Sequence, residues 1–399
     1  MMGNPITVLE LTSNSVKLLV GYELEERQPI VLYAGTIFVD GAVTEGEIIN
    51  QDELIAAINK LVKDASTQLE IKIDEVILAL PSINLEVYTD SQQTNVLANT
   101  LRVEHIDIKN VLSLVRKQRI DPNKTIISIV PERYILDNEK TSVVSPIGET
   151  SSFIAINCYV HLLPLWVYNR YLSVVQAAGI KVTKTFVDSY ALTELIALEK
   201  DASPNYLLVD YGSRTTTISL VGNHRLFYSR IVNLGGDHLT ERIAKELSLT
   251  LEEAHKLKHM YGYDNRASNY KVAIAHQVNE YGQKHPIYQK DLNRVIEAFM
   301  NEHYAKIKDA VASLEASQSL SNLFELYPLY FTGGASQING FNHLLEHSPL
   351  KDRTFILNLK AIGARNSRYA VCLGLLRVYN RYILDIGDER SEVGVLTRD

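Results

Sequence analysis

The chain has 399 residues, enough for two or more compact lobes, and its 46% hydrophobic and 22% charged residues exclude wholesale disorder. Its net charge of −7 argues against a broad nucleic-acid-binding surface, which needs clustered Lys and Arg, so we expect no nucleic-acid partner. No apolar run reaches the ~18 residues of a membrane span, and the N-terminus lacks a signal-peptide pattern, so we expect neither a secreted nor an integral membrane protein.

The beginning of the chain predicts a small sheet and a helix. Residues 6–11, 15–24 and 30–38 are three β-rich runs separated by turn residues. A capping pattern at Asn50 then precedes apolar residues at helical spacing, and residues 75–80 form a further buried strand.

The same order of elements returns in the second half, with strands at residues 206–210, 215–221 and 225–234 and a helix over 238–247. Placing Glu10 on Asp210 gives an offset of 200 residues, which also places Ser13 on Ser213. This pattern predicts an internal duplication of the fold.

Other segments lie between and after the two repeats. Residues 82–161 alternate β-rich runs with one helix, which predicts an inserted subdomain, and an amphipathic helix over 163–178 is expected to pack on the first lobe. Residues 252–319 are mostly helical in pattern, the strand at 329–332 leads into two glycines, and residues 385–399 read as a frayed tail.

Cysteine and histidine spacing predicts no metal or redox site. Cys158 and Cys372 lie far apart in apolar stretches, which indicates reduced thiols and a cytosolic protein. Trp166, the single tryptophan, lies next to an apolar helix face and is predicted to be in the core. Four histidines have no partners at metal-ligand spacing and are interpreted as surface residues: His255, His259, His276 and His285.

The candidate chemistry lies in two turns that each follow an acidic residue. A tight turn of small residues exposes backbone N–H groups that can bind a phosphate. Glu10 and Asp210 precede such turns and would bind Mg²⁺ through water or orient an attacking water molecule. Either turn alone is more often structural, but the matched pair, with Gly333-Gly334-Ala335 after a buried strand, predicts three loops around one ATP-binding cleft.

The order of these loops resembles the actin/Hsp70/sugar-kinase superfamily and, within it, the FtsA family. The resemblance covers nearly the whole chain. Its most specific segments are Val130-Pro-Glu-Arg-Tyr-Ile-Leu-Asp137 with Ser145-Pro-Ile-Gly148, Leu234-Gly-Gly-Asp-His-Leu-Thr240, Glu253-Ala-His-Lys-Leu-Lys258 with Tyr261-Gly262, and Phe331-Thr-Gly-Gly-Ala-Ser-Gln337.

The resemblance implies an α/β, actin-like two-lobed fold with duplicated mixed β-sheet domains. Subdomain 1A would comprise residues 1–81 with about 163–190 and 373–390, and residues 82–162 would be an FtsA-type inserted subdomain, 1C, placed differently from the extra subdomain of actin. Residues 191–234 and 318–372 would form subdomain 2A, and residues 235–317 the mostly helical subdomain 2B.

The resemblance also assigns the site. Glu10 and Asp210 would be the catalytic and magnesium-binding acids, and Asp188 and Ala191 would lie where the first connection between the lobes passes. Without the resemblance, Lys258 would be interpreted as an exposed solubilising residue, because it lies in a charged helix. The residues implied to bind ATP are Ser13, Asn14, Lys17, Gly212, Ser213, Arg214, Thr215, Gly236, Lys258, Gly333, Gly334 and Ala335.

Three residues depart from the family pattern, which has glycine at these positions: Thr12, Ser213 and Arg214. A Cβ in a turn of positive φ costs on the order of 1 kcal/mol or more, so we expect strained, narrowed phosphate turns. Arg214 could compensate by contacting a phosphate. We therefore expect ATP binding and at most a weak ATPase.

The resemblance implies an assembly protein of cell division. It would polymerise through 1C and the second lobe, bind the C-terminal tail of FtsZ through 2B, tether FtsZ filaments to the inner face of the cytoplasmic membrane at the septum, and recruit later division proteins. Members of the family reach the membrane through a C-terminal amphipathic helix, and nothing after Asp385 has that character. Either the chain is truncated or it reaches the membrane another way, and we favour truncation.

Two alternatives remain open. One is a kinase or phosphatase of the same superfamily that acts on a small molecule, although no set of polar residues near Asp188 predicts a sugar site. The other is a scaffold of the pilus-assembly type, which the segment 253–258 fits equally well, whereas the segment 131–148 favours cell division.

Overall fold

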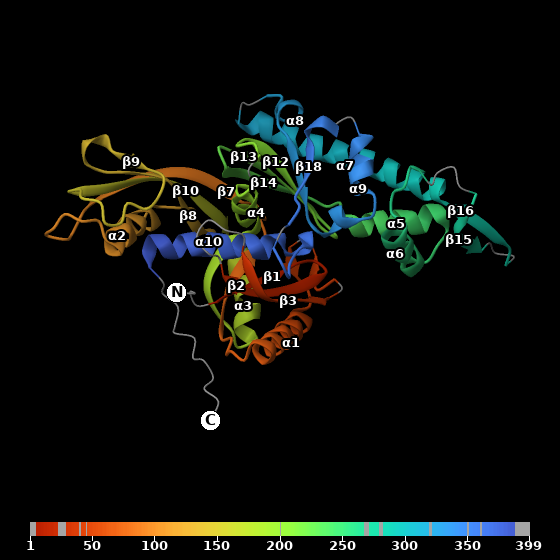
Figure 1. Ribbon diagram of the computed structural model, residues 1–399, viewed down its shortest axis with the longest axis horizontal. Coiled ribbons are helices and arrows are strands. Elements are labelled where there is room, and N and C mark those ends of the chain that lie inside the picture. Colours follow the sequence, from red (N-terminus) through yellow and green to blue (C-terminus); the bar gives the residue numbers. More distant parts are fainter. Residues whose placement is uncertain are drawn as a thin grey trace.

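The computed structural model describes residues 5–22, 29–39, 41–44, 46–199, 201–266, 271–278, 282–318, 321–348, 351–359 and 361–387, and Figure 1 shows its ribbon. Most of the expected tail therefore lies outside the described residues. Asp385 itself does not, because it belongs to the last helix, α10 (Ala370–Ile386). The tail prediction placed the end of regular structure about two residues too early.

The first sheet carries the first acidic turn. Its strand order is β11-β6-β1-β2-β3, with β1 antiparallel to β2 and parallel to β6. The amphipathic helix α3 (Leu165–Ala177) packs on this lobe, as predicted, because Val167, Tyr171 and Val174 join the same hydrophobic core as the sheet. The remaining elements are β1 (Ile6–Leu11), β2 (Ser15–Tyr22), β3 (Ile30–Phe38), β4 (Val43–Thr44), β5 (Glu47–Ile48), α1 (Gln51–Leu69), β6 (Glu75–Leu80) and β11 (Lys181–Val187).

The second sheet repeats this arrangement, with the order β14-β13-β12-β17-β18. Glu10 pairs with Lys17 across the first hairpin, and Asp210 pairs with Thr217 across the second, so the offset of 200 holds on both strands. The predicted duplication is confirmed, and the fold is α/β and actin-like. The strands are β12 (Tyr206–Tyr211), β13 (Thr216–Gly222), β14 (Arg225–Val232), β17 (Leu329–Thr332) and β18 (Thr354–Ile356).

The inserted segment forms its own four-stranded sheet in the order β7-β10-β8-β9, with a separate core against α2 (His105–Arg116). Figure 1 shows this unit at one end of the molecule and α5, α6, β15 and β16 at the opposite end. The last strand, β10, runs to Pro164, beyond the predicted end of the inserted subdomain. The strands are β7 (Glu86–Asn95), β8 (Lys124–Ile135), β9 (Thr141–Ser142) and β10 (Phe153–Pro164).

The part of the second lobe that was expected to be mostly helical also contains a β-hairpin. Its strands carry polar residues and Pro286, and apolar and polar residues do not alternate along them, so the sequence did not predict them as strands. The long helix α7 (Gln289–Gln318) follows directly. The other elements are α5 (Gly236–Leu247), α6 (Leu251–Met260), β15 (Ala273–Val278), β16 (Lys284–Tyr288), α8 (Leu323–Leu326) and α9 (Phe341–Glu346).

Two helices cross between the lobes, α4 (Asp188–Ile196) and α10. Their backbones approach closely at Gly374, where an added Cβ would lie 2.1 Å from the carbonyl oxygen of Ala191. Only glycine allows this crossing. Trp166, by contrast, is 45% exposed at the first turn of α3, so its prediction as a core residue was wrong.

Candidate functional site

A cavity of about 400 Å³ lies where the two acidic turns face each other. It is lined by residues of both sheets, of the start of α5, of the end of α6 and of the loop after β17. All but one of the expected site residues line this cavity: Glu10, Ser13, Asn14, Lys17, Asp210, Gly212, Ser213, Thr215, Gly236, Lys258, Gly333, Gly334 and Ala335.

The first turn joins β1 to β2 and is held by its own hydrogen bonds. The amide of Thr12 donates to the carbonyl of Ser15 at 2.9 Å, and the Thr12 hydroxyl donates to the same carbonyl at 3.0 Å. The turn is tied to the end of β3 because Val39 N donates to the Asn14 carbonyl. The Thr12 side chain, which a glycine would lack, therefore adds a hydrogen bond to the turn.

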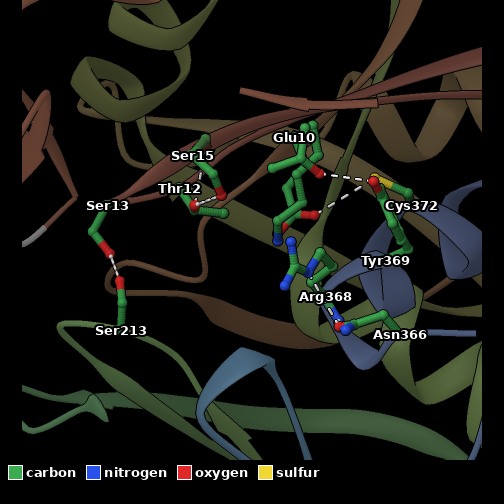
Figure 2. Close-up of polar contacts among 11 residues, drawn as sticks. Glu10, Thr12, Ser13, Ser15, Ser213, Asn366, Arg368, Tyr369 and Cys372 are labelled. Carbon is green, nitrogen blue, oxygen red and sulfur yellow. Dashed lines mark hydrogen bonds and ion pairs between the residues drawn. The ribbon is translucent and has the colours of Figure 1, made fainter. Parts of the chain in front are cut away.

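Behind this turn, Glu10 forms a buried ion pair with Lys17. The Lys17 ammonium lies 3.0 Å from Glu10 Oε1, and the Cys372 thiol of α10 donates to Glu10 Oε2 at 3.5 Å. Figure 2 shows Glu10 and Cys372 side by side. Burial lowers the pKa of Lys17, but the attraction of Glu10 and of other nearby acidic groups outweighs it, and the pKa is raised. Lys17 is therefore a permanent cation in the cleft.

The second turn, between β12 and β13, is hydrogen-bonded to the start of α5. Gly212 N donates to the carbonyl of Thr215 at 3.0 Å, and Asp237 N donates to the carbonyl of Ser213 at 2.8 Å. Arg214 points to α5 instead of the cleft. Its guanidinium pairs with Asp237 at 3.4 Å and with Glu241 at 2.7 Å. The prediction that Arg214 lines the site is not met, because two carboxylates of α5 hold it.

The expected strain in the two turns is absent. Thr12, Ser213 and Arg214 all have negative φ, since none of them is among the described residues with positive φ. A side chain at these positions therefore carries no left-handed penalty. The prediction of strained turns was wrong because both turns form without a left-handed residue.

The loop after β17 approaches the second acid. Gly333 has a φ of 88°, and a Cβ there would lie 2.4 Å from Asp210 Oδ1. Glycine is required at this position on both grounds. Ala335 lies opposite Gly236, where an added Cβ would come within 2.8 Å of the alanine Cβ. The backbone thus forms a narrow, flat wall between the second sheet and α5.

A third carboxylate, Asp188 at the start of α4, joins the two predicted acids in the cavity. It accepts hydrogen bonds from Ser82 Oγ and, at 2.6 Å, from Ser189 N. Burial raises the pKa of Asp188 to about 6, and burial, followed by the repulsion of Asp188 and Glu10, raises the pKa of Asp210 to about 7. The sequence analysis placed Asp188 between the lobes but gave it no chemical role. The available indication was its position, because it follows a buried strand and begins a helix.

Lys258 is buried on α6 and not exposed. Its ammonium donates to the Gly236 carbonyl at 2.8 Å and to Thr240 Oγ1 at 2.7 Å, and burial lowers its pKa to about 8. His255 and His259 are exposed at the rim of the same cavity, in line with their interpretation as surface residues. The described part of the chain contains no group of three or more His, Cys, Asp or Glu placed to hold a metal directly.

Magnesium held through water is compatible with the donors present. Among the described residues, no hydrogen bond or ion pair engages the Asp210 carboxylate, which lines the cavity. An unengaged carboxylate beside two others suits a hydrated hard cation. Glu10 is less available, because Lys17 and Cys372 occupy its two oxygens.

Comparison with known proteins agrees with this geometry. The family profile described as "Cell division protein FtsA" matches residues 207–374, and that described as "SHS2 domain inserted in FTSA" matches residues 84–162. The chain is similar to FtsA of Enterococcus faecalis, with 24% identity over 95% of this chain and 84% of the relative. It is also similar to FtsA of Staphylococcus epidermidis, with 26% identity over 92% of this chain and 77% of the relative.

Solved structures share the fold at low sequence identity. The PilM protein of a PilM-PilN type IV pilus biogenesis complex aligns with a TM-score of 0.58 and 17% identity, over 93% of this chain and 97% of that one. MreB5 of Spiroplasma citri bound to ADP aligns with a TM-score of 0.53 and 13% identity, over 96% of this chain and 97% of that one. With both family profiles matched in order along the duplicated fold, the chain belongs to the FtsA family of actin-like cell-division proteins.

Proposed function

We propose that the chain binds Mg·ATP between its two lobes and uses it as a conformational ligand. The observation that carries this proposal is the meeting of two duplicated turns in one cavity with Lys17, Asp188 and Asp210. Lys17 supplies a permanent positive charge for the phosphates, and the turns supply hydroxyl and backbone donors. MreB5, which has the same fold, is described as bound to ADP.

Mg²⁺, when bound, would neutralise charge on the phosphates and order the water around them. Asp210 and Glu10 would hold that hydrated ion. Asp188 would orient the attacking water, since its carboxylate is fixed by Ser82 and Ser189. Hydrolysis would be slow for two reasons. Glu10 is already engaged by Lys17, and Asp210, with its pKa raised to about 7, is partly protonated near neutral pH.

Calorimetry with Mg·ATP tests the binding site. Lys17→Met removes the cation of the cleft and should weaken ATP binding by at least about tenfold, the usual scale for a charge-assisted contact. Lys256→Met is the matched control, because Lys256 is exposed on α6 and pairs only with Glu252 among the described residues. Equal affinities for the two variants would count against the proposed phosphate site.

The second part of the proposal is assembly. ATP would close the lobes, and the closed chain would polymerise head to tail through the inserted segment 82–162 and the second lobe. Figure 1 places the inserted segment and the α5, α6, β15 and β16 part of the second lobe at opposite ends of the molecule, an arrangement that suits a heterologous contact that does not close. The segment 235–317 would bind the C-terminal tail of FtsZ and link FtsZ filaments to the cytoplasmic membrane at the septum, where further division proteins would join.

Pelleting with and without Mg·ATP, beside binding of an FtsZ tail peptide, tests this part. A chain that stays monomeric in every nucleotide state and ignores the peptide would leave the assembly role without support. No described helix is long and apolar enough to cross a bilayer. Peripheral membrane contact, which belongs to the proposed role, would be tested by flotation with anionic vesicles, alone and in the presence of filaments.

The pilus-scaffold alternative is favoured only by the likeness to PilM, which at 17% identity shows the fold alone. The small-molecule kinase alternative is favoured by Asp188, a carboxylate of raised pKa in the cavity. A screen for ATP consumption that depends on an added hydroxyl compound would separate that enzyme from an assembly protein, which should show none.

A further inference from the structure

The two turns that face the cavity touch each other directly. Ser13 Oγ lies 3.0 Å from Ser213 Oγ, and either hydroxyl can be the donor. Figure 2 shows the two side chains pointing toward one another from opposite lobes. They occupy the same place in the two duplicated hairpins. The contact therefore joins the lobes at the point where the phosphates are proposed to lie.

Both serines lie on turns that are fixed by backbone hydrogen bonds within their own lobe. The first turn is closed by Thr12 N donating to Ser15 O at 2.9 Å, and the second is fixed by Asp237 N donating to Ser213 O at 2.8 Å. Because each turn is braced within its own lobe, the distance between the hydroxyls depends on how far apart the lobes are. The hydrogen bond forms only when the lobes are close.

The protons of the two hydroxyls limit what the pair can do. A serine hydroxyl donates one hydrogen bond, and an ionised phosphate oxygen only accepts. While Ser13 and Ser213 are bonded to each other, one of their two protons is used between them. Both serines can donate to a phosphate only after their mutual bond has broken. The contact and full phosphate coordination are therefore alternatives.

We propose that the Ser13–Ser213 hydrogen bond is a latch between the lobes that competes with the phosphate chain of a nucleotide. This inference rests on the proposed function, since it takes the phosphates to lie between the two turns. Without phosphate, the latch holds the two turns against each other; a bound nucleotide would join the lobes through its phosphates instead, which exchange the latch for charge-assisted bonds to each serine. A charge-assisted bond is about twice as strong as the neutral one that it replaces.

A disulfide trap tests the latch in the full chain. In Ser13→Cys/Ser213→Cys, oxidised glutathione should form an intramolecular disulfide, and Mg·ATP at ten times its dissociation constant should slow this reaction about tenfold by mass action. Adenosine, which lacks phosphates, should not slow it. Cys158 and Cys372 stay in place because both are buried.

The control pair is Ser13→Cys/Arg214→Cys, since Arg214 points to α5 and should not crosslink. Failure of the Ser13/Ser213 pair to crosslink, or crosslinking at an equal rate with ATP bound, overturns the latch. Calorimetry of the wild-type chain keeps the two ideas apart: loss of ATP binding there refutes the proposed function, whereas ATP that binds without slowing the crosslink refutes only the latch.

A second measurement covers the case in which the double variant does not fold. In Ser213→Ala, hydrogen exchange of the Thr12 amide should be faster than in the wild type without nucleotide and equal to it with saturating Mg·ATP. Unchanged exchange without nucleotide overturns the latch.

Discussion

Glu194 of α4 offers a stability test that is separate from the cleft. Its carboxylate is 1% exposed and pairs with Arg225 of β14 at 3.4 Å and with Arg377 of α10 at 3.9 Å, and it also accepts from Arg381. One acid thus joins both crossing helices to the second sheet. Attraction to Glu194 is the main reason that the pKa of Arg381 is raised.

Glu194→Gln keeps the size of the side chain and removes its charge. Breaking a buried ion pair by removing one partner costs about 3–5 kcal/mol, because the other charge is left uncompensated. We take the lower end, about 3 kcal/mol, since Arg381 is 39% exposed and water can screen it. With an unfolding entropy of roughly 2.1 cal/mol/K per residue, this corresponds to a fall in Tm of about 4 °C for the 399-residue chain.

Differential scanning calorimetry measures the effect, and Glu241→Gln is the matched control. Glu241 pairs with Arg214 at 2.7 Å, but the two side chains are 46% and 44% exposed, so its loss should cost less than about 1 kcal/mol. Equal shifts in Tm for the two variants would show that burial of the Glu194 network does not set its contribution.

Three further predictions concern single residues that do not line the cavity. Burial lowers the pKa of His303 to about 4, so the unfolded chain binds more protons than the folded one between pH 6.5 and 4. The free energy of unfolding should therefore fall by up to about 3 kcal/mol as pH falls through that window. His303→Gln should flatten this part of the plot of stability against pH, and an unchanged slope would count against the reasoning. Gly374→Ala places a Cβ 2.1 Å from the Ala191 carbonyl and should cost at least about 1–3 kcal/mol in urea unfolding; a wild-type midpoint would mean that α4 and α10 separate easily. Trp166 is 45% exposed on α3 and does not line the cavity, so its fluorescence should be quenched by acrylamide equally with and without Mg·ATP.

The strands, the acidic turns and the duplication could be predicted from the sequence because they rest on local patterns. Alternating or continuous apolar runs end at Glu10 and Asp210, and small residues follow each. The β15–β16 hairpin was missed because apolar and polar residues do not alternate along either strand and Pro286 interrupts β16, which leaves no periodic signal.

Side-chain destinations were harder to predict than the turns that carry them. Lys258 lies in a charged helix, and only the approach of α5 shows that its ammonium caps the Gly236 carbonyl. Arg214 follows a phosphate turn, yet Asp237 and Glu241 on the next helix hold it. Both outcomes depend on contacts between elements, which a single sequence does not encode locally.

The last helix has a mechanical consequence. Near its start, α10 touches the first acidic turn through Cys372, and at its end Ile386 is buried in the core of the inserted segment. At 1.5 Å per residue, Gly374 and Ile386 are about 18 Å apart along the helix. A tilt of roughly 5° about the Gly374 crossing therefore moves Ile386 by about 1.5 Å, a step that a close-packed core absorbs only by repacking. A small tilt of α10 at the cleft would thus produce a larger displacement at its other end, in the inserted segment.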